Sequence, residues 1–520
     1  MGAAALGGWR HGALHGLRAA RACRSRMAPL ASRIGGIAAL LGLVMLAGCA
    51  SYGARMHEPP DVGACRALYR DVDAIVAAAG VRDAQEAAIT GFPYLRVDRL
   101  HAALRHAARD DAAFEDWVTR LQAMDRAARR HELANLPVDA RAALSSRHGT
   151  REDPGRGLAD CAETLRAADL GDAVARRALL AQADAPPAYL AWQRVAGLYW
   201  ITRLGFARGV GDLERDLQEV FDAPALPGAG TRRRYAPPPG ERLDPRQVRA
   251  ILERSRRGPF ALPVPDAESA ERLFASFAPE ITVDTTGTHD LFGALAWTSA
   301  TAPEVEVGTP VVYRRIAHTL VGGQALLQLV YTIWFPERPA SGPLDPLAGA
   351  LDAVVWRVTL APDGEPLVFD SIHGCGCYHQ FFPTPRATPR PAPGALEEWA
   401  FAPQSLPRLA RGERVTLHLA TRTHYLQRIG VDEPPQPAHA YGFAAEDALR
   451  SLPRPDGTRR GIYGPDGLVP GTERPERFLF WPMGIPSAGT MRQWGHHATA
   501  FVGRRHFDDP DLLERRFDLR

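Results

Sequence analysis

Four residues that can bind a metal ion or attack a substrate stand at alternate positions of one short stretch. They are His373, Cys375, Cys377 and His379, and glycines fill two of the three gaps. In an extended strand, alternate side chains point to the same face of the sheet. The stretch therefore predicts a functional centre built from imidazoles and thiols.

Geometry limits how these four side chains can act together. At about 3.3 Å per residue, a straight strand would spread His373 and His379 over roughly 20 Å, too far to share one ion. Gly374 and Gly376 can adopt backbone angles closed to other residues, so a turn could gather two or three of the groups. Two structural alternatives remain open. The first is a Cys375–Cys377 disulfide, and the second is that the thiols and imidazoles are simply buried in the core.

Metal binding is the first chemistry that these residues suggest. Two further histidines adjoin predicted strands, since His424 follows residues 415–420 and His497 precedes residues 498–502. Imidazole and thiolate ligands suit zinc, iron or copper. The predicted ligands are His373, Cys375, Cys377, His379, His424 and His497. No His-Glu-x-x-His or Cys-x-x-Cys signature supports them, so this prediction depends on ligand density alone.

Thiol chemistry is the second possibility. Cys377 or Cys375 could be a nucleophile with a neighbouring histidine as its base, or the two could form a redox pair. A disulfide across a single intervening residue would be strained and easily reduced. The candidate catalytic residues are His373, Cys377, His379 and Asp370.

Helices are predicted for residues 61–222, which form an N-terminal all-α domain. Apolar residues recur there at spacings of three and four, with Gly80 and Pro137 among the breaks. We expect Cys65 and Cys161 to form a disulfide between two of these helices. Trp192 and Trp200 are expected in the core.

The later part of the chain predicts a mainly antiparallel β-sheet domain with helices, so the fold class is α+β. Residues 223–243 are rich in proline and glycine and predict a linker. Two helices are expected next, at 244–256 with Asp244 as N-cap and at 267–277. Residues 354–372 predict a hairpin, with a Pro-Asp-Gly turn, that leads directly into His373. The α+β domain spans 244–520.

The N-terminus resembles that of bacterial lipoproteins. Arginines precede an apolar run at 34–46, and Leu46-Ala47-Gly48-Cys49 is similar to a lipobox. The resemblance implies a signal peptide at 1–48, cleavage before Cys49, and acyl chains, palmitate among them, on that cysteine. Residues 49–60 would then tether the protein to a bilayer. Ala50 favours the outer membrane, with the protein facing the periplasm.

Charge and composition exclude some functions. The first 48 residues contain six arginines and no acidic residue, so the net charge of +3 becomes −3 after cleavage, and nucleic-acid binding is not expected. The chain has no lysine, which excludes lysine Schiff bases. The sequence thus predicts an envelope lipoprotein with a metal-dependent hydrolase or oxidoreductase centre at 370–379. The alternative is a non-enzymatic structural or interaction lipoprotein with disulfide-bonded cysteines.

Overall fold

The structure is a computed structural model that describes residues 59–148, 154–226, 228, 230–299, 302–394, 396–410, 413–434 and 436–520. Residues Asp61–Arg520 form one compact unit. The predicted signal peptide, the predicted lipidation site Cys49 and all but the end of the predicted tether lie outside the described residues. None of the described helices has both the length and the apolar composition needed to cross a bilayer.

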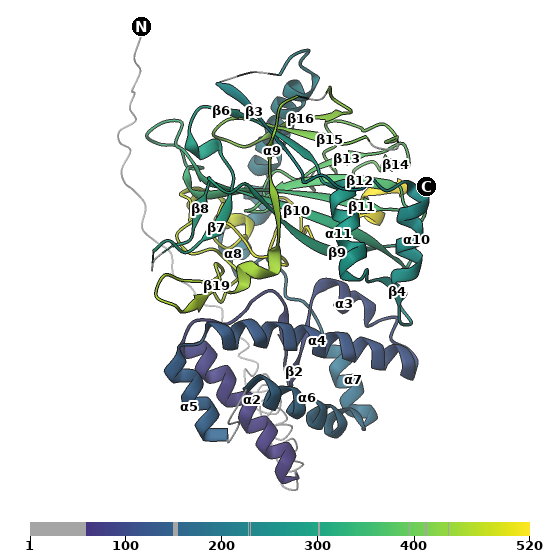
Figure 1. Ribbon diagram of the computed structural model, residues 1–520, viewed down its shortest axis with the longest axis vertical. Coiled ribbons are helices and arrows are strands. Elements are labelled where there is room, and N and C mark those ends of the chain that lie inside the picture. The colour runs from purple at the N-terminus through teal and green to yellow at the C-terminus, as the bar shows by residue number, and fades with distance from the viewer. Residues whose placement is uncertain are drawn as a thin grey trace, which may run out of the picture. The chain divides into compact units, whose positions relative to one another are not determined.

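The N-terminal part consists mainly of helices, drawn in purple and blue beside the sheets in Figure 1. They are α2 (Pro60–Ala78), α3 (Arg99–Leu104), α4 (Asp111–Asn135), α5 (Val138–His148), α6 (Pro154–Leu170) and α7 (Ala173–Gln182). Their apolar stripes meet in one core, where Val72, Trp117 and Leu165 are fully buried. The part is not all-α as predicted, because β1 (Ala87–Ile89) and β2 (Phe92–Val97) form a hairpin within it.

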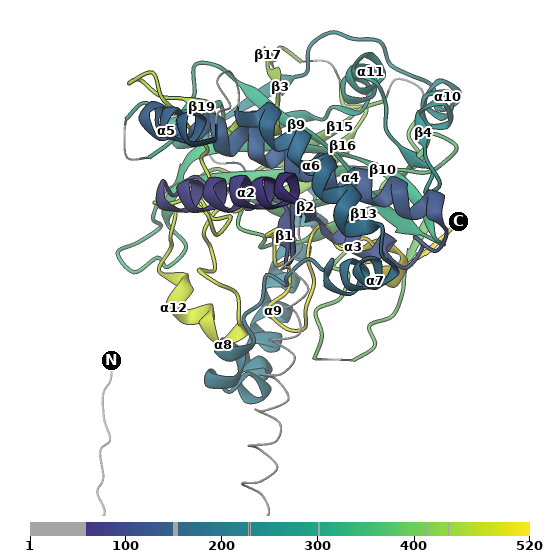
Figure 2. The same ribbon diagram turned by 90° about the horizontal axis from the view of Figure 1, so that it is seen from below.

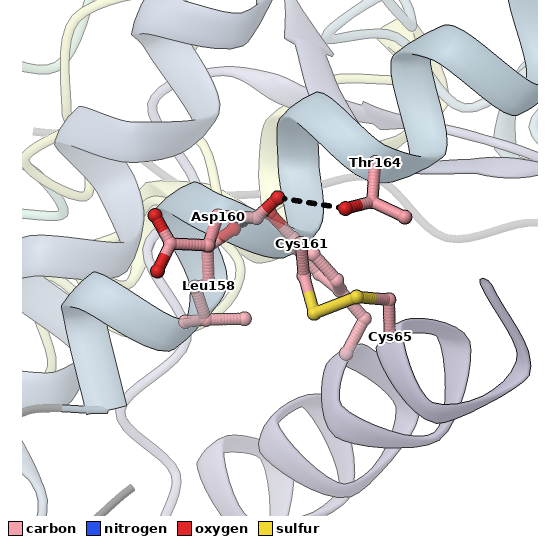
Figure 3. Close-up of a disulfide and its surroundings, with 6 residues drawn as sticks. Cys65, Leu158, Asp160, Cys161 and Thr164 are labelled. Carbon is pink, nitrogen blue, oxygen red and sulfur yellow. Dashed lines mark hydrogen bonds between the residues drawn. A yellow bond between two sulfur atoms is a disulfide. The ribbon is translucent and has the colours of Figure 1, made fainter. Parts of the chain in front are cut away.

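The predicted disulfide between Cys65 and Cys161 is confirmed. Cys65 lies on α2 and Cys161 on α6, with their Cα atoms 5.1 Å apart and a separation of 96 positions in sequence. Figure 3 shows the bond between the two helices. The bond therefore links the first described helix to one near the end of the helical part.

Two large sheets form the centre of the C-terminal part, which also contains smaller two-stranded sheets. The larger has the order β13-β12-β11-β10-β9-β18 and the smaller the order β16-β15-β6-β3-β17. Neighbouring strands are antiparallel except in the pairs β15–β6, β17–β3 and β18–β9. The predicted α+β class is therefore confirmed. The strands of the larger sheet are β9 (Val311–Val321), β10 (Gln324–Arg338), β11 (Gly349–Leu360), β12 (Pro366–His373), β13 (Gln380–Pro383) and β18 (Gly442–Ala445). Those of the smaller are β3 (Thr231–Ala236), β6 (Glu280–Thr285), β15 (Val415–Leu419), β16 (Leu426–Val431) and β17 (His439–Ala440).

The predicted linker at 223–243 contains one of these strands, which corrects that prediction. β3 pairs antiparallel with β6, with Arg233 opposite Val283. Arg234 is buried and forms an ion pair with Glu280. Proline and glycine on both sides of this short run hid the strand from a reading based on composition.

The main core lies between the two sheets and two helices, α10 (Pro245–Ser255) and α11 (Ala267–Phe277). Both helices agree with the predicted ones, and Asp244 caps α10 in a capping box with Gln247. The core includes Ile281 of β6 and Trp356 of β11. It positions the β11–β12 hairpin, which was also predicted.

Helices α8 (Ala191–Ala196) and α9 (Tyr199–Asp222) connect the helical part to the sheets. Phe221 at the end of α9 is buried in the sheet core. Trp192 and Trp200 were expected in the core, but they are 63% and 65% exposed. The remaining elements are β4 (Arg256–Arg257), β5 (Leu262–Pro263), β7 (Ala294–Ala296), β8 (Glu304–Glu306), β14 (Ala387–Pro389), β19 (Leu452–Pro453), β20 (Arg459–Arg460), α12 (Glu476–Phe480), α13 (Leu512–Arg516) and β21 (Phe517–Leu519).

Candidate functional site

The stretch with the four reactive side chains is a turn between β12 and β13. Strand β12 ends at His373, whose N–H donates to the Cys377 carbonyl (2.9 Å), and Gly376 N–H donates to the His373 carbonyl (2.7 Å). Gly376 has a φ of 90°, and a Cβ there would lie 2.5 Å from the Ala498 carbonyl oxygen. Only glycine fits this position. The alternation expected of a strand therefore stops at His373.

His373 lies at one end of the turn, beside a buried carboxylate of β11. Its Nδ1 is 3.5 Å from Asp352 Oδ1, and His424 Nδ1 is 2.8 Å from the other oxygen, Asp352 Oδ2. Arg474 Nη2 donates to Asp352 Oδ1 at 3.3 Å. Burial alone would raise the pKa of Asp352, but His373 and Arg474 hold it well below its usual range. Two of the predicted ligands, His373 and His424, thus meet at an aspartate.

His424 is enclosed between two carboxylates. Its Nε2 lies 3.6 Å from Asp290 Oδ1, and its ring stacks on Phe335 with the centroids 3.8 Å apart. Burial opposes a charge on the ring, yet the hydrogen bonds to Asp290 and Asp352 raise the pKa of His424. Burial lowers the pKa of His373. The pair therefore favours a neutral His373 beside a more basic His424.

His379 lies at the other end of the turn, in a separate charged cluster. Its Nε2 is 2.9 Å from Asp370 Oδ2, and Arg357 Nε donates to Asp370 Oδ1 at 2.9 Å. The Arg357 guanidinium also lies over the Phe507 ring, 3.7 Å from its centroid. Burial lowers the pKa of His379 to about 3, so the imidazole is neutral. Because Asp370 and His373 are three positions apart on one strand, these two clusters lie on opposite faces of the sheet.

Cys375 and Cys377 are both free thiols and lie against each other inside the turn. The Cys377 N–H donates to Cys375 Sγ at 3.4 Å. The interaction between the two side chains lowers the pKa of Cys375 and raises the pKa of Cys377. Cys375 is buried and Cys377 half-buried. Cys375 is therefore the more acidic of the two thiols.

Both thiols line a cavity of about 280 Å³. Val210, Leu213 and Leu217 of α9 form one wall, and Phe480 and Phe501 contribute to another. The walls are mainly apolar with a few polar groups, as in sites for small molecules. A second hollow of about 390 Å³ lies elsewhere, and in it Asp363 pairs with Arg386 and Glu365 pairs with Arg408. The cavity beside the thiols is therefore the stronger candidate.

Two buried carboxyls face this cavity. Glu398 accepts hydrogen bonds from the N–H groups of Phe501 (2.6 Å) and Val502 (2.8 Å). Glu476 is 3% exposed, and its carboxyl has no hydrogen bond or ion pair with any residue that the structure describes. Burial raises the pKa of each to about 7. The cavity thus holds groups that can gain or lose a proton near neutral pH.

Backbone strain is concentrated around the site. Tyr378 has a φ of 58°, His424 one of 51° and Leu351, next to Asp352, one of 51°. Residues other than glycine adopt this region at a cost, and such residues cluster at functional sites. Tyr378 and Tyr425 are hydrogen-bonded through their hydroxyls, and both line the cavity.

The predicted metal ligands do not converge on one point. His373 and His424 contact Asp352, His379 contacts Asp370, and the thiols contact each other. His497 is buried with its ring 6.4 Å from that of Phe507, and burial lowers its pKa to about 3. Within the described ranges, no three Cys, His, Asp or Glu side chains are arranged to hold one ion.

Sequence reasoning missed several residues of the site. Asp352 is a lone acidic residue within the apolar strand β11, and that contrast was a usable signal. Glu398, Glu476 and the wall formed by α9 come from distant segments, and nothing local marks them. No family model, curated protein or solved structure matches this chain.

Proposed function

We propose that the protein is a thiol oxidoreductase of the bacterial envelope. In this proposal, Cys375 and Cys377 cycle between dithiol and disulfide, exchanging electrons with a small, largely apolar substrate in the cavity. The observation that carries the proposal is two free cysteines, linked by a hydrogen bond from the Cys377 N–H to Cys375 Sγ, at the wall of a mainly apolar cavity. A volume of about 280 Å³ suits a small molecule rather than a folded protein.

In the proposed reaction, Cys375 attacks as the thiolate, because its pKa is the lower of the two. This thiolate attacks one sulfur of a small disulfide and releases the first substrate thiolate, leaving a mixed disulfide. Cys377 then loses its proton and attacks Cys375 Sγ, which releases the second substrate thiolate. The protein disulfide forms, and the substrate disulfide gains two electrons and leaves as two thiolates, while the proton of Cys377 passes to Glu476; protons from solvent then convert the product thiolates to thiols. The reverse sequence oxidises a substrate dithiol.

Glu476 is the proposed proton acceptor for Cys377. Its carboxyl is buried with no hydrogen bond or ion pair to the residues that the structure describes, and it interacts electrostatically with both thiols. Because its pKa is about 7, it is partly ionised at neutral pH and can take up a proton. The two histidines have another role: His373 and His379 bind Asp352 and Asp370 and thereby hold the two ends of the turn.

The proposed location is the outer membrane, with a lipid anchor on Cys49 and the folded unit facing the periplasm. The lipobox at 46–49 supports this location. The Cys65–Cys161 disulfide is in keeping with an oxidising compartment.

The test is single-turnover reaction with 2,2′-dithiodipyridine, a small neutral disulfide. Wild-type protein is expected to release two thiopyridone molecules and to form the Cys375–Cys377 disulfide. Cys377→Ser should release one and retain a mixed disulfide on Cys375, and Cys375→Ser should react much more slowly. Equal reactivity of the two variants would contradict the assignment. Stoichiometric zinc, iron or copper that is lost in both variants would instead support a metal-dependent enzyme.

A further inference from the structure

Large apolar side chains are exposed together on α8, α9 and α12. Of the thirteen such side chains exposed in the described part of the chain, seven lie on these helices, and an eighth, Leu198, lies in the two-residue link between α8 and α9. The main ones are Trp192, Val195, Trp200, Leu204, Phe478 and Leu479, which we call the α8–α9–α12 patch. Scattered single exposures are ordinary, but a contiguous group marks a site of association.

The patch is continuous because the three helices are held together. Leu190 N–H, at the start of α8, donates to the Gly484 carbonyl (2.7 Å), and Arg194 Nε donates to the Met483 carbonyl (2.7 Å). Gly197 lies so close to Pro482 that a Cβ there would be 2.6 Å away. Figure 2 shows α8, α12 and the start of α9 together on the lower side of the unit.

The charge of the patch is positive. Residues 185–211 contain three arginines and no acidic residue. Arg203, Arg208 and Arg477 form no ion pair with any residue within the described ranges, and Arg477 lies over the Phe478 ring at 4.8 Å. Unpaired arginines among exposed tryptophan, phenylalanine and leucine match the chemistry of an anionic phospholipid surface, in which aromatic rings enter the interface and guanidinium groups meet phosphates.

We infer that the α8–α9–α12 patch binds the surface of a bilayer that contains anionic phospholipid. This contact is separate from the lipid anchor on Cys49, and it uses no part of the thiol chemistry. It orients the folded unit on the membrane. The first half of α9 carries part of the patch, and Val210, Leu213 and Leu217 further along the same helix line the cavity. Helix α9 therefore connects the membrane-bound surface to the cavity wall.

The experiment uses the mature chain from residue 49 with Cys49→Ser, so that no acyl chain contributes. The protein is mixed with vesicles of phosphatidylethanolamine and phosphatidylglycerol, or of phosphatidylcholine alone, and sedimented. Wild type is expected to sediment with the anionic vesicles, more weakly as salt is added. A Trp192→Ser/Trp200→Ser variant should bind about tenfold more weakly or worse. The matched control is Leu344→Ser, which removes a side chain that is 94% exposed outside the patch and should leave binding unchanged.

A second measurement does not depend on the folding of a variant. Nitroxide-labelled lipid in the vesicles is expected to quench the tryptophan fluorescence of the wild type, because Trp192 and Trp200 enter the interface. Absence of both sedimentation and quenching would overturn the inference. A different result would assign the patch to a second copy of the chain instead. In that case the protein would dimerise with rising concentration, the double substitution would abolish the dimer, and the protein would not bind vesicles.

Discussion

At the scale of single residues, the two thiols have different surroundings although only Gly376 separates them. Cys375 is buried and accepts a hydrogen bond from the Cys377 N–H, while Cys377 is half-buried. An asymmetric pair suits a sequence in which one sulfur attacks and the other resolves. The carboxyl of Glu476 completes the set, because a proton must leave Cys377 before it can resolve the mixed disulfide.

Glu476→Gln tests the proton acceptor. In the wild type, the rate of the resolving step should rise as pH increases through about 7, where burial places the Glu476 pKa. A glutamine cannot take up the proton, so the rise near that pH should disappear and the rate at pH 8 should fall by about tenfold to a hundredfold. The measurement is the pH profile of release of the second thiopyridone. Glu473→Gln, outside the cavity, is the control; an unchanged profile in Glu476→Gln would remove Glu476 from the mechanism.

The residues of the site were predictable only where chemistry is concentrated in the sequence. Cys375 and Cys377 stand out because reactive groups are dense there, and both line the cavity. His373 and His379 were predicted as site residues, but the pairing of each with its partner, Asp352 and Asp370 respectively, was not. The sequence does not show where β12 ends, so it could not show that the two pairs lie on opposite faces of the sheet. Glu476 and Glu398 come from segments about a hundred and about twenty residues away from the turn, and only tertiary folding brings them to it.

At the scale of elements, the β12–β13 turn is held at both ends by a buried imidazole–carboxylate pair. His373 contacts Asp352 at one end, and His379 contacts Asp370 at the other. Both aspartates come from the β11–β12 hairpin, whose register is fixed by long antiparallel pairing. The strained turn is therefore supported by the most regular part of the sheet.

Asp370→Asn tests this support. Arg357 and Asp370 are each 1% exposed, so removing the carboxylate leaves a buried guanidinium without its counter-charge. We expect a loss of about 3–5 kcal/mol in the free energy of unfolding. Asp363→Asn, in the exposed turn of the same hairpin, removes a surface ion pair and should cost less than about 1 kcal/mol. Urea unfolding compares the two, and equal costs would show that the buried cluster does not support the turn.

The Cys65–Cys161 bond is the second structural link at this scale. It spans 96 positions, so the chain-entropy account assigns it about 4–5 kcal/mol. Cys65→Ala/Cys161→Ala should lower the urea midpoint accordingly. Cys377→Ser, which breaks no bridge, should change it little. A double alanine variant as stable as the wild type would mean that the loop is already ordered in the unfolded chain.

The structure agrees with the sequence-based prediction for elements that have strong local signals. It differs for elements that are stabilised by their neighbours in the fold. Helix α10 was predictable from Asp244, Pro245 and the apolar stripe that follows. Strand β3 was not, because its short basic run shows no apolar alternation and is stabilised by pairing with β6. The apolar spacing of α8 and α9 indicated helices correctly, but periodicity does not reveal which apolar face is covered. Trp192 and Trp200 were therefore placed in the core in error.

At the scale of the whole molecule, buried titratable groups link stability to pH. Glu398 and Glu476 have pKa values raised by burial from 4.5 to about 7, so the folded state binds more protons than the unfolded state between these values. Their contribution to stability is fully present below pH 4.5 and is lost as pH rises through about 7. Buried neutral histidines act in the opposite direction, since the pKa values of His379 and His497 are lowered to about 3.

The double variant Glu398→Gln/Glu476→Gln separates the contribution of the two carboxyls to the pH dependence of stability from that of the histidines. The difference in unfolding free energy between this variant and the wild type should be smallest below pH 4.5 and grow toward pH 7, in favour of the variant. The growth should reach up to about 3 kcal/mol for each carboxyl. Urea unfolding at a series of pH values measures it. A difference that does not change with pH would mean that the two carboxyls titrate normally in the folded protein.

The most direct test of the whole account is a redox titration of the Cys375–Cys377 pair in glutathione buffers. Free thiols are trapped by alkylation and located by mass spectrometry, and the metal content of the same sample is determined. The account predicts a reversible dithiol–disulfide transition at a potential more oxidising than about −300 mV, with Cys65–Cys161 oxidised throughout and no dependence on metal. Two results would contradict the account. One is a Cys375–Cys377 pair that stays reduced in every buffer. The other is a Cys375–Cys377 disulfide that is reduced only at potentials below about −300 mV, as structural disulfides are.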